Sequence, residues 1–162
     1  MSAYDCPMYY EIAFSYQQVK RQVGFFEEVF REFRKKKPER FLDIGCGPSP
    51  QLREIARRGY EVVGLDINAN MLRYLDQKAK KEGLKIETVQ ADMKGFKLKR
   101  KCDFAFNLSG SLYVRSNQGF LKHLRCVANA LNEGGIYLLE NVTIPMQPHV
   151  GQEWTMKRDD IE

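Results

Sequence analysis

The residues FLDIGCGPSP at positions 41–50 decide the fold. The apolar residues that open this stretch indicate a buried strand. Gly45 and Gly47 permit a sharp turn that comes close to a ligand, because neither carries a Cβ atom. Ser49 is a good helix N-cap, and Pro50 fits the first helical position. The stretch therefore predicts a strand, a tight turn and a helix start whose free N–H groups face a polar or anionic ligand.

Composition predicts one globular domain. The chain has 162 residues, of which 43% are apolar and 29% charged, and this length suffices for a core of its own. The four cysteines lack the spacing of a zinc site or a disulfide framework, which indicates no metal and a reducing, cytoplasmic location. We find no secretory signal and no run of about 20 apolar residues, so we expect no membrane.

The positive charge of the chain is concentrated in three runs. The net charge of +5 is compatible with acidic partners, and the runs lie at 34–37, 78–81 and 97–101. Aromatic residues do not interleave with these runs, as a base-stacking site requires. The sequence therefore favours solvated helix ends and loops, and nucleic acid is a possible partner but not the favoured one.

The first 37 residues are predicted to form N-terminal cap helices. Tyrosines at positions 4, 9, 10 and 16 accompany Phe14, and they serve either to pack a short helix onto the domain or to form a lid over a ligand. From position 19 to 33 the apolar residues recur every three or four positions, which predicts a helix. Pro38 ends it after the basic run.

The remainder of the chain alternates between strand and helix patterns. Short apolar runs at 41–44, 60–65, 86–90, 104–106 and 136–139 predict five strands, and residues 132–135 read as a turn. Helical patterns separate most of them. This alternation predicts an α/β fold with a mostly parallel sheet covered on both faces. We expect a core over 38–141 and an irregular tail over 142–162.

Three aspartates stand at the ends of the first three predicted strands. In an open parallel sheet, ligands bind outside the carboxyl ends of the strands. Asp66 follows Gly45 by 21 residues, a distance that suits a carboxylate accepting from both hydroxyls of a ribose. Asp92 can accept from an exocyclic amine such as that of adenine. Asp43, two residues before the first glycine, would repel phosphate and favours a cationic amino group.

The same turn disfavours two common nucleotide sites. A dinucleotide fingerprint needs glycine or alanine where Pro50 stands, and a P-loop needs a lysine that is missing here. Pro48 and Pro50 also remove two N–H groups that a pyrophosphate would use.

With these features the chain resembles class I S-adenosylmethionine-dependent methyltransferases. The matching segments are 42–48, 63–68, 89–93, 102–107 and 131–140. The resemblance implies a Rossmann-like three-layer sandwich, S-adenosylmethionine as cofactor and S-adenosylhomocysteine as product. The cofactor-binding residues that it implies are Tyr10, Asp43, Gly45, Gly47, Asp66, Ile67, Met71, Asp92, Met93, Asn107 and Leu108.

The resemblance also assigns these residues to parts of the cofactor. Gly45 and Gly47 would approach the methionine part, with Asp43 near its amino group. Asn107 and Leu108 would line the same end, and Tyr10 would belong to the lid. Asp66 would hold the ribose, and Asp92 with Met93 the adenine.

The chain departs from the family pattern in two places. Ser49 replaces the third glycine of the family turn, which a helix cap tolerates. The family sheet has seven strands, of which the last two are antiparallel, whereas the sequence predicts five. We therefore expect the C-terminal strands to be missing, through truncation or because another subunit completes the sheet. The sequence predicts no oligomeric state.

The resemblance implies methyl transfer by in-line displacement. The loop at 107–110 reads NLSG and lacks the Pro-Pro motif of methyltransferases that act on nucleobase amines, which favours a small-molecule acceptor. An RNA or protein methyltransferase, or a non-catalytic module that binds S-adenosylmethionine or a partner, remains open. No catalytic residue is assigned: His123 reads as a packing or surface residue, and Glu140 and Asn141 are weak candidates for the acceptor side.

Overall fold

The computed structural model describes residues 3–112 and 116–140. The helices are α1 (Pro7–Ala13), α2 (Val19–Arg34), α3 (Pro50–Arg57), α4 (Ala69–Lys81) and α5 (Asn117–Ala130), and a short 3-10 helix, Ala3–Asp5, precedes α1. The strands are β1 (Arg40–Ile44), β2 (Glu61–Asp66), β3 (Glu87–Gln90), β4 (Cys102–Asn107) and β5 (Leu131–Leu139). The predicted tail and Asn141 lie outside the described residues.

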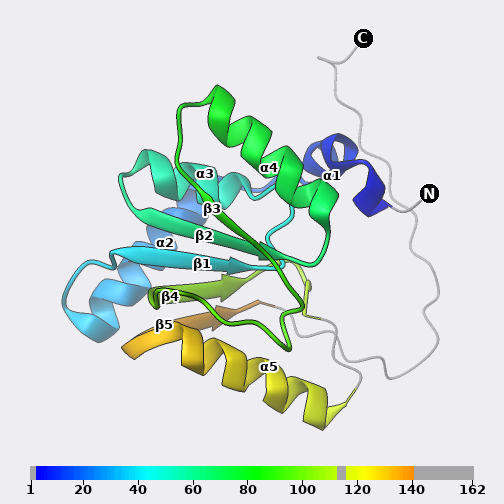
Figure 1. Cartoon of the computed structure of the whole chain (residues 1–162). Helices are drawn as coiled ribbons and strands as arrows, with labels where there is room; N and C mark the ends of the chain where they lie inside the picture. The colour runs from blue at the N-terminus through cyan, green and yellow to red at the C-terminus, as the bar shows by residue number, and fades with distance from the viewer. Residues whose placement is uncertain (1–2, 113–115, 141–162) are drawn as a thin grey trace.

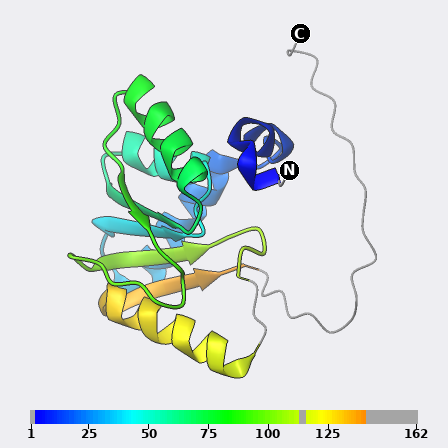
Figure 2. The same ribbon diagram turned by 45° about the vertical axis from the view of Figure 1, so that its right-hand side comes forward.

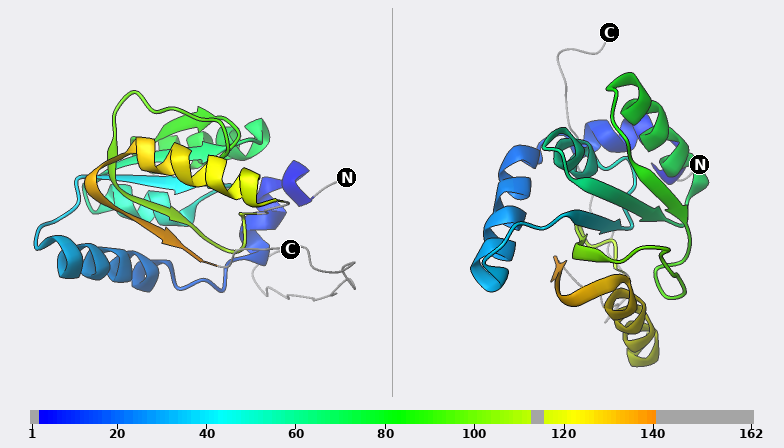
Figure 3. Two further views of the ribbon diagram at one scale, coloured as in Figure 1. Left: turned by 90° about the horizontal axis from the view of Figure 1, so that it is seen from below. Right: turned by 60° about the vertical axis from the view of Figure 1, so that its left-hand side comes forward.

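The five strands form one parallel sheet in the order β3-β2-β1-β4-β5. Helices α2, α3 and α4 pack on one face and α5 on the other (Figures 1 and 3). This arrangement confirms the predicted Rossmann-like α/β sandwich. Strand β1 lies between β2 and β4, so the strand order reverses there, and a ligand crevice is expected at its carboxyl end. Helix α1 stands beyond that end of the sheet (Figure 2).

Aromatic packing fixes α2 on the sheet. Phe26 and Phe30 come from the predicted apolar face of α2 and are buried. The ring of Phe26 lies 5.4 Å from that of Phe104 and 4.8 Å from that of Phe106, both on β4. Such ring pairs stabilise beyond the area they bury. The apolar residues of α2 that recur at helical spacing therefore form the face of the helix that packs against the sheet.

The start of β5 differs from the prediction. Residues 132–135, predicted as a turn, lie inside this strand, where the register shifts between the pairs Cys102↔Leu131 and Phe104↔Ile136. The turn chemistry is nevertheless present, because Gly134 has a φ of 69°. These residues therefore bulge out of a strand that pairs on both sides of them.

Gly64 in β2 allows α3 and α4 to pack closely on the sheet. A Cβ atom at this position would lie 2.9 Å from Sγ of Cys46 and 3.0 Å from Cδ1 of Leu52. We expect Gly64→Ala to lower the free energy of unfolding by about 1–3 kcal/mol through overpacking, as measured by urea denaturation. Gly95→Ala is the control, since a Cβ atom there meets nothing within 4 Å. Equal stability of the two variants would contradict this packing.

Candidate functional site

The turn after β1 has the predicted shape. Gly45 and Gly47 have φ angles of 72° and 53°, in the left-handed region that glycine adopts without strain. The N–H groups of Gly45 and Cys46 both donate to the carbonyl of Leu65, at 2.7 and 3.0 Å. Ser49 caps α3 by accepting from the N–H of Leu52 at 3.0 Å. The turn is therefore tied to β2 on one side and to α3 on the other.

Ser49 keeps the backbone conformation of a glycine. Its φ is 29°, a value at which a side chain costs strain. Its hydroxyl donates to Oδ2 of Asp43 at 2.6 Å while accepting from the cap N–H. These two hydrogen bonds offset the strain. The residue that departs from the family pattern thus adds a contact to the turn's acidic side chain.

Asp43 is buried at the carboxyl end of β1, with 5% of its surface exposed. Burial raises the pKa of this carboxyl to about 7, the hydrogen bond from Ser49 opposes the rise, and the charge of Asp66 adds to it. A neighbouring cation would favour the ionised form. Near neutral pH the Asp43 carboxyl can therefore lose its proton when a cationic group binds beside it.

Asp66 joins β2 to the glycine turn. Its Oδ2 accepts from the N–H of Gly47 and its Oδ1 from that of Asn68, both at 2.8 Å. An ionised carboxylate has about four lone-pair sites, so each oxygen retains capacity for another donor. Asp66 therefore shapes the turn and still offers acceptors to a ligand.

Two adjoining hollows lie at this end of the sheet. The smaller, about 250 Å³, is lined in part by Gly47, Asp66, Ile67, Met71 and Met93. The larger, about 390 Å³, is lined in part by Asp43, Pro48, Gln51, Tyr74 and Leu108. Tyr10, Gly45, Ser109 and Ser111 line both. Together they form one cleft within the size range of small-molecule sites, and Tyr10 of α1 stands at the boundary between its halves.

Tyr10 belongs to a group of aromatic rings that roofs the cleft. Its ring stacks on that of Phe14 at 4.5 Å and lies 5.8 Å from that of Tyr4. Burial raises the pKa of Tyr10 to about 12, with smaller contributions from Tyr4 and the two aspartates. The Tyr10 hydroxyl is therefore neutral at physiological pH and can donate a hydrogen bond.

Nine of the eleven residues predicted to bind the cofactor line this cleft, and Asp92 and Asn107 do not. Asp92 is exposed, and its Oδ1 accepts from the N–H of Lys94 at 2.8 Å. Asn107 is fully buried and donates to the carbonyl of Ile44. Its Oδ1 atom has no partner among the described residues. Asn107 thus supports the turn from beneath, and ligand contact by either residue stays a prediction.

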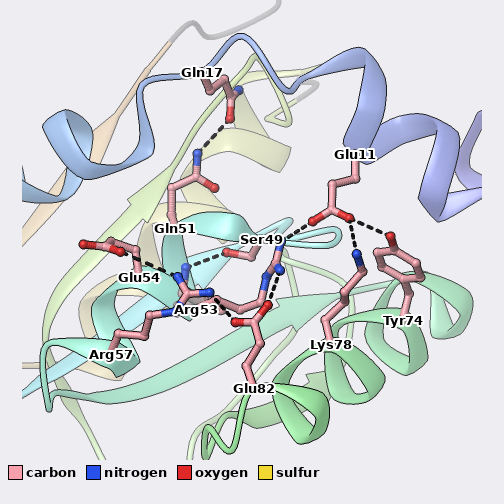
Figure 4. Close-up of polar contacts among 11 residues, drawn as sticks. Glu11, Gln17, Ser49, Gln51, Arg53, Glu54, Arg57, Tyr74, Lys78 and Glu82 are labelled. Atoms are coloured by element: carbon pink, nitrogen blue, oxygen red, sulfur yellow. Dashed lines mark hydrogen bonds and ion pairs between the residues drawn. The ribbon is translucent and has the colours of Figure 1, made fainter. Parts of the chain in front are cut away.

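Helix α1 is attached to the domain through Glu11 (Figure 4). The Glu11 carboxylate accepts from the guanidinium of Arg53, from the Tyr74 hydroxyl at 2.6 Å and from Nζ of Lys78 at 3.1 Å. Arg53 also contacts Glu82, at 2.6 Å. These partners come from α3, α4 and the residue after α4, so one carboxylate joins the roof of the cleft to two helices of the sandwich.

We expect Glu11→Ala to release α1. The substitution leaves the buried Arg53 with a single carboxylate and removes hydrogen bonds to a charged group, each of which contributes about 1.5–3 kcal/mol. Amide hydrogen exchange in α1 is expected to accelerate by about 10- to 100-fold. Glu28→Ala is the control, because Glu28 is exposed on α2. Unchanged exchange in α1 would contradict the attachment.

Gln17 joins three parts of the cleft wall. Its Nε2 donates to Oγ of Ser109 at 2.9 Å, and its Oε1 accepts from Nε2 of Gln51 at 2.8 Å. The segment between α1 and α2 is thereby fixed both to α3 and to the loop after β4. Sequence reasoning missed this bridge and the Glu11 contacts, because nothing local to either residue signals partners so far along the chain.

His123 is a packing residue. It is fully buried, its Nδ1 lies 3.1 Å from the Met93 carbonyl, and its Nε2 lies 2.7 Å from the Tyr137 hydroxyl. Burial lowers its pKa despite the Met93 carbonyl and the charge of Asp92, which raise it. A neutral ring that donates from Nδ1 and accepts at Nε2 satisfies both contacts, so His123 has no free atom to offer a substrate.

The described residues, 3–112 and 116–140, contain no group of three metal-ligating side chains and no helix long and apolar enough to cross a membrane.

The family model described as "Methyltransferase domain" matches residues 41–135, more than half of the chain. A protein named as a methyltransferase in Geobacillus sp. strain WCH70 is 24% identical over 140 residues, which cover 86% of this chain and 57% of that protein. The ubiquinone biosynthesis O-methyltransferase of Pelagibacter ubique is 26% identical over 141 residues, covering 81% of this chain and 58% of its own. The chain thus spans a little over half the length of these relatives.

Solved structures share the fold. The S-adenosylmethionine-bound structure of an amino pentose methyltransferase from Micromonospora echinaspora superposes with a TM-score of 0.72 at 22% identity, covering 90% of this chain and 61% of its own. The family match, the sheet order and the glycine turn with its aspartates agree. The chain belongs to the class I S-adenosylmethionine-dependent methyltransferase family.

Proposed function

We propose that the chain binds S-adenosylmethionine in the cleft and transfers its methyl group to a small-molecule acceptor. The observation that supports this most is the turn of Gly45 and Gly47 between Asp43 and Asp66, which offers a buried carboxylate for a cationic amino group and a partly exposed one for a ribose. The open approach to Gly47, where a Cβ atom would meet only the Tyr10 ring at 3.9 Å, leaves space for a ligand against the backbone.

The chain's own residues bind, orient and exclude water. Asp43 would hold the amino group, Asp66 the ribose hydroxyls, and Ile67, Met71 and Met93 the nucleoside. When bound, S-adenosylmethionine supplies an electrophilic methyl group on a sulfonium. Alignment of the acceptor contributes about 7–11 kcal/mol to such a reaction. An acceptor that holds a proton at neutral pH would in addition need a base, or water, to take that proton up.

Three features support the remaining parts of the proposal. The modest volume of the two hollows fits a small acceptor, and the relatives named above act in the chemistry of an amino pentose and of ubiquinone. Cys46, Cys102 and Cys126 are free thiols, which supports a reducing, cytoplasmic location. Residues 1–37 serve as the cap and 38–141 as the cofactor-binding core.

Calorimetric titration of the folded chain tests the proposal. S-adenosylmethionine and S-adenosylhomocysteine are expected to bind with one site each, and NAD is expected not to bind. A folded chain that binds neither sulfur ligand would refute the cofactor assignment. Binding without release of S-adenosylhomocysteine in the presence of a panel of small amines and phenols would support the non-catalytic module instead.

A further inference from the structure

Eight exposed lysines lie at the end of the sheet opposite the cleft. We call them the lysine row: Lys35, Lys36, Lys37, Lys80, Lys81, Lys85, Lys99 and Lys101. They flank the connections that enter β1, β3 and β4 at the amino ends of these strands. Because the strands are parallel, these entries gather at one edge of the sheet (Figure 1). Three runs of basic residues that are separate in the sequence therefore lie at the same end of the sheet, where the strands begin.

Contacts around Arg40, the first residue of β1, bring two of the runs together. Its guanidinium lies 2.7 Å from Glu61 and 2.5 Å from Glu87. Arg100, between two lysines of the row, lies 2.8 Å from the same Glu61. Lys80 lines a hollow together with Arg40 and both carboxylates. The run before β4 and the run after α4 thus meet across the start of β2.

The remaining run lies beside the entry to β4. Asp103 accepts from the N–H groups of Glu39 and Arg40 at 2.8 and 3.2 Å. Burial raises the pKa of Asp103, but hydrogen bonds from Asn132 and these two N–H groups, together with the charge of Lys36, lower it below its usual range. Lys36 precedes β1, which lies beside β4 in the sheet, so this run enters the sheet next to the lysines that precede β4.

At this end of the sheet the arginines pair with the acids and the lysines do not. The ion pairs are Arg40 with Glu61 and Glu87, Arg57 with Glu54 and Glu82, Arg58 with Glu27 and Glu54, and Arg100 with Glu61. No lysine of the row makes an ion pair with any described residue, and five nearby carboxylates, those of Glu32, Glu39, Asp76, Asp103 and Glu133, also lack one. Eight positive charges therefore face five negative ones, and this excess is available to an external anion.

The shape of the surface points to a linear anion. Adjacent strands lie about 4.8 Å apart, so the three spacings from β3 to β4, whose entries carry the lysines, give a row about 14 Å long. Cations along this row match successive phosphates of a nucleic-acid strand. The missing aromatic residues exclude base stacking, but phosphate contacts do not need them.

We propose that the lysine row binds a nucleic-acid strand through its phosphates, without reading its bases, at the end of the sheet opposite the cleft. Such a strand is held away from the methyl-transfer site and is not its acceptor. Binding would be independent of the cofactor and strongly dependent on salt.

Fluorescence anisotropy with an end-labelled oligouridylate of about 16 nucleotides tests the proposal. Affinity is expected to fall steeply between about 50 and 200 mM salt. The variant K36Q/K101Q is expected to bind on the order of tenfold more weakly near 0.1 M salt and to lower the slope of log K against log salt by about 1.4, since each lost contact removes about 0.7. K122Q/R125Q, on exposed positions of α5, removes the same charge and is expected to bind as the unaltered chain does.

Four results would overturn the proposal. The first two are an absence of binding at about 50 mM salt and equal weakening of binding by both double variants. The third is displacement of the oligonucleotide by S-adenosylhomocysteine. The fourth is that the chain sediments with phosphatidylserine vesicles but does not bind the oligonucleotide. Oligouridylate binding by a chain that fails to bind S-adenosylhomocysteine would leave this proposal standing and refute the proposed function, so the two are tested separately.

Discussion

Asp43→Asn is expected to weaken cofactor binding by about 10- to 100-fold while leaving the ligand-free protein as stable as the unaltered chain at pH 8, or more stable. The pKa of Asp43 is raised to about 7 by burial, whereas in the unfolded chain it is about 3.9. The folded state therefore holds a proton that the unfolded state has lost. The resulting destabilisation grows by about 1.4 kcal/mol per pH unit between about pH 4 and 7, is complete above 7, and disappears in acid. Asparagine has no ionisable group at this position, so the variant does not suffer this loss of stability.

Two measurements check this expectation. Thermal unfolding at pH 6 and pH 8 should show the unaltered chain losing stability relative to Asp43→Asn as the pH rises. Titration with S-adenosylhomocysteine should show affinity lowered by about 10- to 100-fold in the variant, because a hydrogen-bonded charge is lost. In the unaltered chain affinity should rise with pH up to about 7, as Asp43 gives up its proton. A variant that binds as tightly as the unaltered chain would refute the role of Asp43.

Asp66→Ala is expected to cause the largest loss of cofactor affinity, about 100-fold or more. Two ribose hydroxyls would donate to this carboxylate, and hydrogen bonds to charged groups contribute about 1.5–3 kcal/mol each. The same substitution leaves the N–H groups of Gly47 and Asn68 without an acceptor, because in the unaltered chain both donate to the Asp66 carboxylate at 2.8 Å. The loss therefore combines a missing ligand contact with a less ordered turn.

Asp66→Asn is the milder change. Its carbonyl oxygen can still accept from the N–H of Gly47, but its amide nitrogen cannot accept from that of Asn68 and offers the ribose a donor in place of an acceptor. Calorimetric titration of both variants should rank affinity as unaltered chain, Asp66→Asn, Asp66→Ala. Asp76→Ala on α4 removes the same charge away from the cleft and should bind normally. Normal affinity in Asp66→Ala would refute the ribose assignment.

Local pattern was enough to predict most of the fold. The strand, turn and cap at 41–50 depend on glycine, serine and proline positions whose preferences act within a few residues, and the structure has the same turn with Ser49 as its cap. The spacing of apolar residues in α2 likewise predicts which face of the helix packs on the sheet. The turn predicted at residues 132–135 lies inside a strand, because the pairing of this segment with β4 is a tertiary contact that local sequence does not encode.

The site was only partly predictable, because its arrangement depends on non-local contacts. Strand-end aspartates and their spacing indicated a nucleoside ligand, and Asp43 and Asp66 do line the cleft. The sequence could not indicate that Arg53 would meet Glu11 across 42 positions and Glu82 across 29. Nor could it indicate that the exposed Asp92 would turn toward Lys94, because the path of residues 91–101 is set by burial of Phe96 against the sheet.

The hydrogen bond between Asp66 and Gly47 has a consequence for how the site forms. It joins residues 19 positions apart and lies within a single strand–helix–strand unit that begins with β1 and ends with β2. Short loops close quickly and at low entropic cost. The amino- and ribose-facing groups can therefore reach their final geometry as soon as β1 and β2 pair, before the rest of the sheet is complete.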